Sequence, residues 1–216
     1  MIPGNANPLL LPIAAGGGAL VIGQSFQGGY YAGTITYGTE SWLGIGGEQY
    51  HLIMAPKSSG EASTIKQYKT SATCDGAESN QTSAQSVWDG YHNTYTSVIG
   101  SSSAHPAANY CQGLSIGGYS DWYLAANQES SLAFGNLRQL AAWQAGGAEE
   151  FTTGTVILNG SSVSGLSAYW NSTGDSCENT GTVGTASIYY QSGGYLISGY
   201  AKTDQFFVRA IRRVAV

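Results

Sequence analysis

The chain has 216 residues, of which only 10% are charged, while 31 are glycine and 15 are tyrosine. This length fits one large domain, or a domain with an appendage. The net charge of −5 argues against a nucleic-acid partner bound through its phosphates. A hydrophobic content of 42% excludes general disorder, and the scarcity of Lys and Glu disfavours long solvated helices.

Residues 1–22 are apolar, but Pro3, Pro8, Pro12 and a run of three glycines interrupt any continuous helix. They carry no positively charged region of the kind that opens a signal peptide. Their uninterrupted apolar stretch is too short to cross a bilayer, so we expect no membrane insertion. We predict an extended arm that anchors the chain to a larger assembly or holds an oligomer together. A loose terminus is the alternative.

Residues 23–216 form the predicted domain. The first half of this domain is expected to contain short strands followed by helices. Glycine alternates with aromatic and β-branched residues over residues 24–52, which is typical of strands joined by Gly-rich turns. Residues 57–85 are polar and predict a long surface loop. Residues 86–100 predict a helix that buries Val87, Tyr91, Tyr95 and Val98. A second short helix is expected to open at Pro106 and to close at Gly113.

A strand–turn–helix unit is predicted over residues 117–140. Its strand is residues 120–124, and Asn127 is the expected N-cap of the helix. Glu129 falls in the first turn, where a carboxylate suits the helix dipole. Loop and strand follow, and then strands at 167–173, 186–190, 195–200 and 205–214. The pattern is that of an α+β fold with short antiparallel sheets, two or three helices and long Gly/Ser/Thr-rich loops.

No pattern in the sequence supports catalysis, a metal site or a cofactor. Residues 113–117 match the G-x-S-x-G nucleophile elbow, but a helix is predicted before Ser115, and all three histidines precede it. The pair Glu149–Glu150 is typical of a solvated loop. Three scattered cysteines, Cys74, Cys111 and Cys177, form no zinc motif, and we expect them to be free and mostly buried.

Loops rich in Tyr, Ser, Gly and Asn are typical of binding surfaces, because tyrosine gives rigid contact area at low entropic cost. The densest such region is residues 171–200. Aromatic faces can stack on sugar rings while amides and carboxylates bind hydroxyls, so a carbohydrate is a reasonable ligand. The alternative interpretation is that these tyrosines fill a β core.

Three ordered boxes, GYSDWYL at 118–124, AYWNST at 168–173 and FVRAIRRV at 207–214, resemble a bacterial and phage domain. Its members carry "G-x-x-D-W-[YR]-L-P", "Y-W-S-S-T" and a terminal "V-R-x-[VI]-R" strand. That domain is related to the formylglycine-generating-enzyme branch of the C-type lectin-like fold. Ala125 stands here where the family has proline, and Asn171 where it has serine. The paired cysteines of the formylglycine-generating enzymes are missing, since Cys177 is alone in its region, so that activity is not carried over.

The resemblance implies structural roles for the residues of the boxes. Trp122 and Trp170 are expected in the core beneath a binding face. Arg209 and Arg212 are expected to hydrogen-bond buried loop carbonyls or Asp121, a role that suits the guanidinium fork.

The resemblance also implies a phage virion protein of the tail fibre or tail tip, displaying a receptor-binding face for host glycan or protein. We expect a homo-oligomer, a trimer above all, because avidity strengthens weak sites. The alternatives are a structural virion component without ligand binding and a secreted bacterial adhesion module. The predicted ligand contacts are Asn171, Asp175, Glu178, Tyr189, Tyr190, Gln191 and Tyr195.

Overall fold

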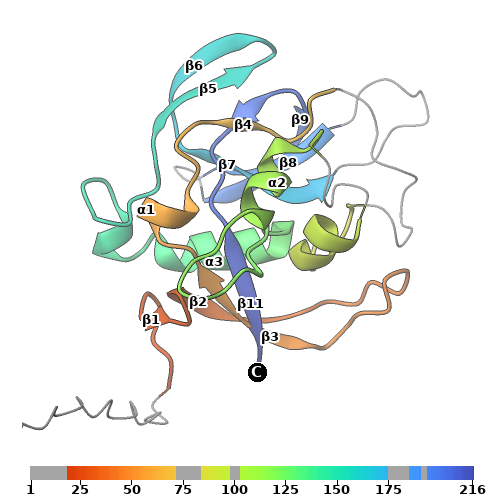
Figure 1. The fold of residues 1–216 in the computed structure, drawn as a ribbon, viewed down its shortest axis with the longest axis vertical. Helices are drawn as coiled ribbons and strands as arrows, with labels where there is room; N and C mark the ends of the chain where they lie inside the picture. Colours follow the sequence, from red (N-terminus) through yellow and green to blue (C-terminus); the bar gives the residue numbers. More distant parts are fainter. Residues whose placement is uncertain (1–18, 72–83, 98–102, 175–184, 191–193) are drawn as a thin grey trace, which may run out of the picture.

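The computed structural model describes residues 19–71, 84–97, 103–174, 185–190 and 194–216. Three sheets and a few helices make up this part of the chain (Figure 1). The first sheet has the order β1-β2-β3-β11, with bounds Ser25–Phe26, Gly29–Thr36, Gln49–Met54 and Ile211–Ala215. The second has the order β4-β10-β5-β6, with bounds Lys66–Gln67, Gln205–Phe206, Gly154–Leu158 and Ser161–Leu166. The third has the order β7-β8-β9, with bounds Ala168–Gly174, Thr185–Tyr190 and Tyr195–Ala201.

The strand pairs within the three sheets are antiparallel, and the helices are short. The helices are α1, α2 and α3, a π-helical turn η1 and a 3-10 turn η2, with bounds Lys57–Gly60, Pro106–Gln112, Asn127–Leu137, His92–Thr96 and Ala141–Trp143. This mixed architecture is compatible with the predicted α+β class. In the described part of the chain, no helix is both long and apolar enough to cross a membrane.

Helix α3 forms the centre of the molecule, in contact with β2 and β3 on one side and with β7, β8 and β9 on the other (Figure 1). Its Phe134 ring lies 5.3 Å from Tyr169, 5.2 Å from Tyr189 and 5.0 Å from Phe151. The helix approaches β2 closely at Gly33, where a β-bulge and a φ of +128° leave room for Asn136. A side chain at Gly33 would meet Asn136 and strain the backbone.

The strand–turn–helix unit differs from its prediction at two points. Residues 120–124 are buried in part but form only one bridge, Tyr123 to Ile211, instead of a strand. The N-cap of α3 is Ala126, and Asn127 is already the first helical residue. Ala126 has no side-chain acceptor, so Glu129 closes the helix end by accepting the Ala126 N–H at 2.9 Å.

Of the helix predicted over residues 86–100, the structure describes residues 86–97, where η1 is the helical element, and Val98 lies outside the described part. Side chains bind the backbone ahead of it: Asn93 accepts the Ser86 N–H at 3.1 Å and donates to the Ser86 carbonyl at 2.8 Å. Glu40 accepts the Val87 N–H at 2.8 Å. These contacts compete with helical hydrogen bonds, and they leave Tyr91 at the surface instead of in the core.

Several other predictions agree with the structure. Pro106 occupies the first turn of α2, and Gly113 caps its end. The predicted strands at 167–173, 186–190 and 195–200 correspond to β7, β8 and β9. The predicted 57–85 loop contains α1 and β4, and its residues 72–83 lie outside the described part.

Candidate functional site

Two predicted ligand contacts, Asn171 and Tyr189, are buried in the described structure. Asn171 has no exposed surface, and its Oδ1 accepts the Thr173 N–H at 3.2 Å. The Tyr189 ring stacks on Phe134 and is 1% exposed. These two side chains therefore pack inside the domain, where a ligand cannot reach them. Side chains alternate between the two faces of β8, and Tyr189 lies on the face that packs against α3. The sequence pattern alone did not decide which face Tyr189 occupies.

The other predicted contacts are not located as side chains. Asp175, Glu178 and Gln191 lie outside the described residues. Tyr190 and Tyr195 pair with each other across the β8–β9 ladder, and only their backbones belong to the described part. A ligand role for these five residues stays a prediction.

The tryptophans and arginines of the sequence boxes lie inside the domain. Trp122 is fully buried, and Trp170, which is 2% exposed, donates its indole N–H to the Lys66 carbonyl at 2.8 Å. Arg209 binds the carbonyls of Ala55 and Glu149 at 2.9 and 3.0 Å. The Arg212 guanidinium donates hydrogen bonds to both carboxylate oxygens of Asp121, at 2.8 and 3.0 Å. Each arginine thus takes one of the two expected kinds of partner.

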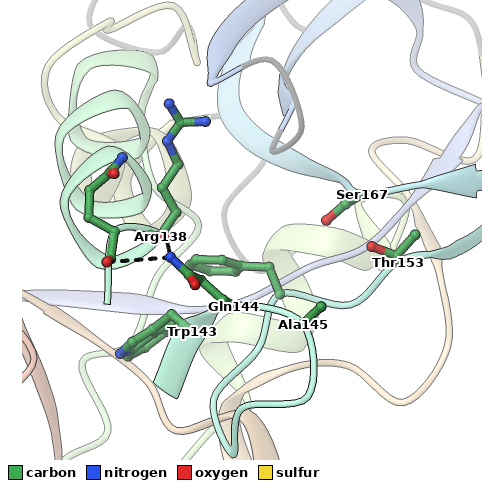
Figure 2. A pocket seen from close by; sticks show the side chains of 8 residues that line it. Arg138, Trp143, Gln144, Ala145, Thr153 and Ser167 are labelled. Atoms are coloured by element: carbon green, nitrogen blue, oxygen red, sulfur yellow. Dashed lines mark hydrogen bonds between the residues drawn. The ribbon is translucent and has the colours of Figure 1, made fainter. Parts of the chain in front are cut away.

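A pocket of about 450 Å³ lies beside the predicted binding region (Figure 2). It is formed by the end of α3, the 141–153 loop and the residue before β7, with Arg138, Gln139, Trp143, Gln144, Ala145, Phe151, Thr153 and Ser167 along its wall. A side chain at Gly194, in the turn before β9, would collide with the Arg138 guanidinium. The pocket therefore lies close to Gly194, the residue before β9.

The loop that forms half of this pocket is anchored by Arg209. The Glu149 carboxylate forms an ion pair with the guanidinium, which also lies 4.4 Å from the Trp143 ring and 5.5 Å from the Phe151 ring. Glu149 also accepts the Lys57 N–H at 2.7 Å. The prediction of a solvated Glu149–Glu150 pair is thus wrong for Glu149, which is 9% exposed.

The aromatic rings of the pocket have their faces occupied by the protein itself. Trp143 contacts Arg209 on its face, meets the Tyr30 ring edge to face at 5.5 Å and lies 5.3 Å from Phe151. Trp143 is 3% exposed and Phe151 is 8% exposed. They close the pocket as an apolar wall, and they offer no open face on which a sugar ring could stack.

Polar groups remain available at the pocket wall. The Ser167 hydroxyl is buried and has no hydrogen-bond partner among the described residues. Gln139, Gln144 and Thr153 are exposed. The Gln144 amide reaches the Arg138 carbonyl at only 3.5 Å, so it can exchange this weak contact for a ligand. The Ser167, Thr153, Gln139 and Gln144 side chains can bind a polar ligand through hydrogen bonds.

The positive charge of Arg138 acts on the β8 side of the pocket. Burial raises the pKa of Tyr189, and the Arg138 guanidinium partly offsets that rise. The sequence carries one signal for this site, since residues 138–144 place Arg, Gln, Trp and Gln close together between glycines. It differs from the Tyr-, Ser-, Gly- and Asn-rich composition that singled out residues 171–200.

A smaller pocket of about 320 Å³ lies between β2 and α3, lined by Thr34, Ile35, Thr36, Trp88, Gln128, Ser131 and Leu132. It holds no ionisable side chain among these residues and no buried polar atom without a partner. It is therefore the weaker candidate.

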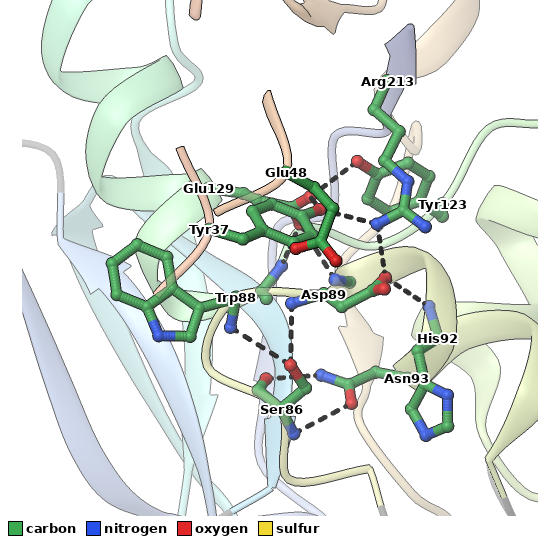
Figure 3. A network of polar contacts seen from close by, with 12 residues as sticks. Tyr37, Glu48, Ser86, Trp88, Asp89, His92, Asn93, Tyr123, Glu129 and Arg213 are labelled. Atoms are coloured by element: carbon green, nitrogen blue, oxygen red, sulfur yellow. Dashed lines mark hydrogen bonds and ion pairs between the residues drawn. The ribbon is translucent and has the colours of Figure 1, made fainter. Parts of the chain in front are cut away.

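A buried polar network around Glu129 joins α3 to β2, β11 and the 84–97 segment (Figure 3). The Glu129 carboxylate accepts the hydroxyls of Tyr37 and Tyr123 at 2.6 and 2.7 Å, and the backbone N–H groups of Gly90 and Ala126 at 3.1 and 2.9 Å. Burial raises its pKa to about 7, partly offset by the charge of Arg213. Glu129 has no exposed surface, so this network is a structural centre and not a binding site.

The remaining motifs form no reactive site in the described residues. Ser115 of the G-x-S-x-G match lies in the short loop after α2 and precedes a tight turn at Gly117, so it has neither the strand before it nor the helix after it that a nucleophile elbow requires. Cys111 is free and buried, whereas Cys74 and Cys177 lie outside the described part. Within the part of the chain that the structure describes, no three His, Cys, Asp or Glu side chains group as a metal site would require.

Comparisons of the chain with protein-family models, with curated proteins and with solved structures find no match. The functional interpretation therefore depends on the sequence boxes and on the geometry of the pocket.

Proposed function

We propose that this chain is a phage tail-fibre or tail-tip protein whose C-type lectin-like domain, residues 23–216, binds a glycan or protein on the host surface. The sequence boxes support this proposal, and their residues are connected in space. Arg212 of the third box holds Asp121 of the first, and the main chain of the second box pairs with the third, where the Trp170 N–H donates to the Phe207 carbonyl at 3.0 Å. The domain would thus present its loops on one shared scaffold.

The observation that carries a binding function is the Arg138 pocket, defined by the eight residues named above. Its volume of about 450 Å³ falls in the range of small-molecule sites, which is about 300–1,000 Å³. It combines an apolar wall with polar groups, including the buried Ser167 hydroxyl, which has no hydrogen-bond partner among the described residues. A buried polar group without a partner is costly, so a ligand hydroxyl at this position would gain a favourable contact.

The arm, residues 1–22, would attach the domain to other virion proteins, and a trimer would multiply the pocket. Residues 1–18 of the arm lie outside the described part. The trimer is tested by sedimentation equilibrium, where a monomer at micromolar concentration would contradict it.

The test of the binding function uses fluorescently labelled protein on candidate host cells and on their extracted surface polysaccharides. A double variant, Gln139→Ala with Gln144→Ala, removes two exposed amides from the pocket. We expect affinity to fall roughly tenfold, because each lost hydrogen bond is worth about 0.5–1.5 kcal/mol.

Gln49→Ala is the matched control, since Gln49 is an exposed amide on β3 that does not line the pocket. The melting temperatures of all variants should stay close to that of the wild type. If the wild type binds cells and the double variant binds equally well, the pocket is not the site. If the folded wild type binds neither cells nor polysaccharide, the structural virion role replaces the receptor-binding one.

A further inference from the structure

We infer that the open edge of β2 is the docking site for the arm of a second copy of this chain, whose residues 8–15 add to the sheet as a further strand. The inference rests on the proposed oligomer and not on the receptor-binding role. It follows from the unpaired edge of β2, from the uncharged pocket beside that edge and from the way the arm leaves its own domain.

One edge of β2 has no neighbouring strand beyond Tyr31 in the described part of the chain. β3 occupies the other edge, and the segment that leads into β1 covers this edge as far as Tyr31, whose N–H donates to the Gln24 carbonyl at 2.8 Å. The next carbonyl, that of Ala32, accepts the side-chain amide of Asn136 at 2.8 Å. No described strand lies beside residues 33–36 on this edge.

The peptide groups of Thr34 and Thr36 point to this open edge. Tyr37 directs its peptide groups to the β3 side, because its N–H donates to the Glu48 carbonyl at 2.9 Å. Peptide groups alternate in direction along an antiparallel strand, so those of Thr36 and Thr34 face away from β3. Such an unpaired row of donors and acceptors is a template for one more strand.

The smaller pocket, of about 320 Å³, borders this row of peptide groups. Both threonines line it, and Leu132, Ser131 and Trp88 form the rest of its wall together with Ile35 and Gln128. None of these side chains is ionisable. The pocket therefore suits an uncharged strand whose backbone pairs with β2 while an apolar side chain enters beside Leu132.

The arm has the composition of such a strand. Residues 1–18 contain no charged side chain, and residues 8–15 read PLLLPIAA. Pro8 and Pro12 are an even number of positions apart, so in a strand their nitrogens face the same side. With that side turned to solvent, the two prolines remove no hydrogen bond from the pairing with β2.

This arrangement places one leucine in the pocket. In an antiparallel register, Leu10 lies opposite Ile35, and its two leucine neighbours bring their peptide groups to the open row of β2. Ile35 is buried and lies on the same face of β2 as Gly33, which α3 approaches closely. Leu10 would therefore enter the smaller pocket, whereas Leu11 would lie on the outer face of the sheet.

The arm does not continue along β2 of its own domain. The Gln24 N–H donates to the Val21 carbonyl at 2.9 Å and closes a turn, in which Gly23 has a φ of +82°. Val21 is 65% exposed. The 18 residues before Ala19 can span about 60 Å when extended, which is enough to reach a neighbouring domain. A second copy is therefore the occupant that we assign to the open edge.

Two measurements on the full chain test this inference. Sedimentation equilibrium gives the dissociation constant of the oligomer, and hydrogen exchange, resolved to single amides by mass spectrometry, reports on Thr34 and Thr36. Both amides should exchange roughly tenfold more slowly, or slower still, in the oligomer than after dilution to the monomer, because the added strand accepts their hydrogen bonds.

The first variant blocks the edge itself. Thr36→Pro removes an N–H that faces away from β3, so the pairing between β2 and β3 is kept. It should weaken association by roughly tenfold or more. Thr36→Ala is the matched control, since it removes the side chain but keeps the N–H, and it should change the dissociation constant by less than about threefold.

Two further variants address the pocket and the arm. Ser131→Arg puts a charged side chain into the pocket from an exposed position on α3, and Ser162→Arg makes the same change on β6, away from it. Leu10→Asp puts a charge on the arm residue assigned to the pocket, and Leu11→Asp is its neighbour control. Ser131→Arg and Leu10→Asp should each weaken association by roughly tenfold, and more than their controls do. Melting curves establish that each variant is folded.

An oligomer that Thr36→Pro and Ser131→Arg leave intact overturns the inference, while the proposed oligomer stands. Amide protection that survives dilution but is lost in Leu10→Asp also overturns it, because each arm then fills the edge of its own domain. Equal losses from Leu10→Asp and Leu11→Asp overturn the placement of Leu10 in the pocket. A wild type that stays monomeric overturns the inference and the trimer together. Binding of that monomer to host cells would leave the receptor-binding role intact.

Discussion

Two buried ionic sites hold irregular segments onto this fold, and they are built in opposite ways. At the Arg209 site, a cation is at the centre, between two backbone carbonyls and the Glu149 carboxylate, with aromatic rings on its faces. At the Glu129 site, a carboxylate is at the centre and accepts hydrogen bonds from two tyrosines and two backbone N–H groups. The first anchors the pocket loop, and the second anchors the 84–97 segment.

The difference determines how each site responds to pH. Burial lowers the pKa of Arg209, but a guanidinium starts so high that it stays charged in proteins. Burial raises the pKa of Glu129 to about 7, which brings its titration into the physiological range. A central cation therefore gives a constant anchor, whereas a central carboxylate makes the stability of its segment depend on pH.

The largest expected effect comes from removing the central cation. Arg209→Ala should lower the free energy of unfolding by about 3–5 kcal/mol, because it leaves Glu149 as a buried and unpaired charge. Urea denaturation at pH 7 measures this loss. Arg209→Lys keeps the charge but not the fork, and an intermediate loss is expected. A loss below about 1 kcal/mol for Arg209→Ala would mean that the loop is held by packing alone.

The Glu129 site should make the free energy of unfolding depend on pH, because the carboxyl group at its centre titrates near neutral pH. The folded protein keeps the Glu129 proton between its ordinary pKa of 4.5 and about 7, where the unfolded chain has released it. The free energy of unfolding should therefore fall as pH rises through this window, by at most about 3 kcal/mol.

Glu129→Gln cannot titrate and should flatten most of that slope. A residual slope of the same sign is expected from Glu61, because burial raises its pKa as well. Urea denaturation of both proteins at several values between pH 4.5 and pH 7 measures the difference. If the variant keeps the full slope, another group is responsible.

The smallest effect is expected at the ion pair between Asp121 and Arg212, which lies near the surface. The side chain of Asp121 is 42% exposed, so water and salt screen its pair with Arg212. Asp121→Asn should cost about 1 kcal/mol or less, and the loss should shrink at 1 M salt. If Asp121→Asn lowers the free energy of unfolding as much as Arg209→Ala does, the burial of an ion pair does not determine how strongly it stabilises this fold.

Local patterns predicted the regular elements of this chain well. Pro106 and Gly113 bound α2, and the strands predicted at 167–173, 186–190 and 195–200 correspond to β7, β8 and β9. Patterns failed where side chains bind the main chain at a distance. The 86–100 helix was predicted from spacing, but Glu40 and Asn93 hold its first residues in another conformation.

The candidate site shows the same limit. The composition of residues 171–200 selected Asn171 and Tyr189 as ligand contacts, but both side chains are buried. The pocket wall comes instead from α3, the 141–153 loop and Ser167. Composition marks a region that is rich in binding residues, but it does not tell which side of a strand faces the core.

The sequence by itself determined that the chain combines short strands with a few helices. It also led to the expectation that Trp122 and Trp170 are core residues, and it fixed the low number of charged side chains. Only the tertiary structure decided that Glu149 is the partner of Arg209, 60 residues away, and that this pair shapes a pocket. It also placed Glu129 among donors from four segments. The physical reason is that local preferences depend on near neighbours, whereas the burial of a charge depends on partners that only folding brings together.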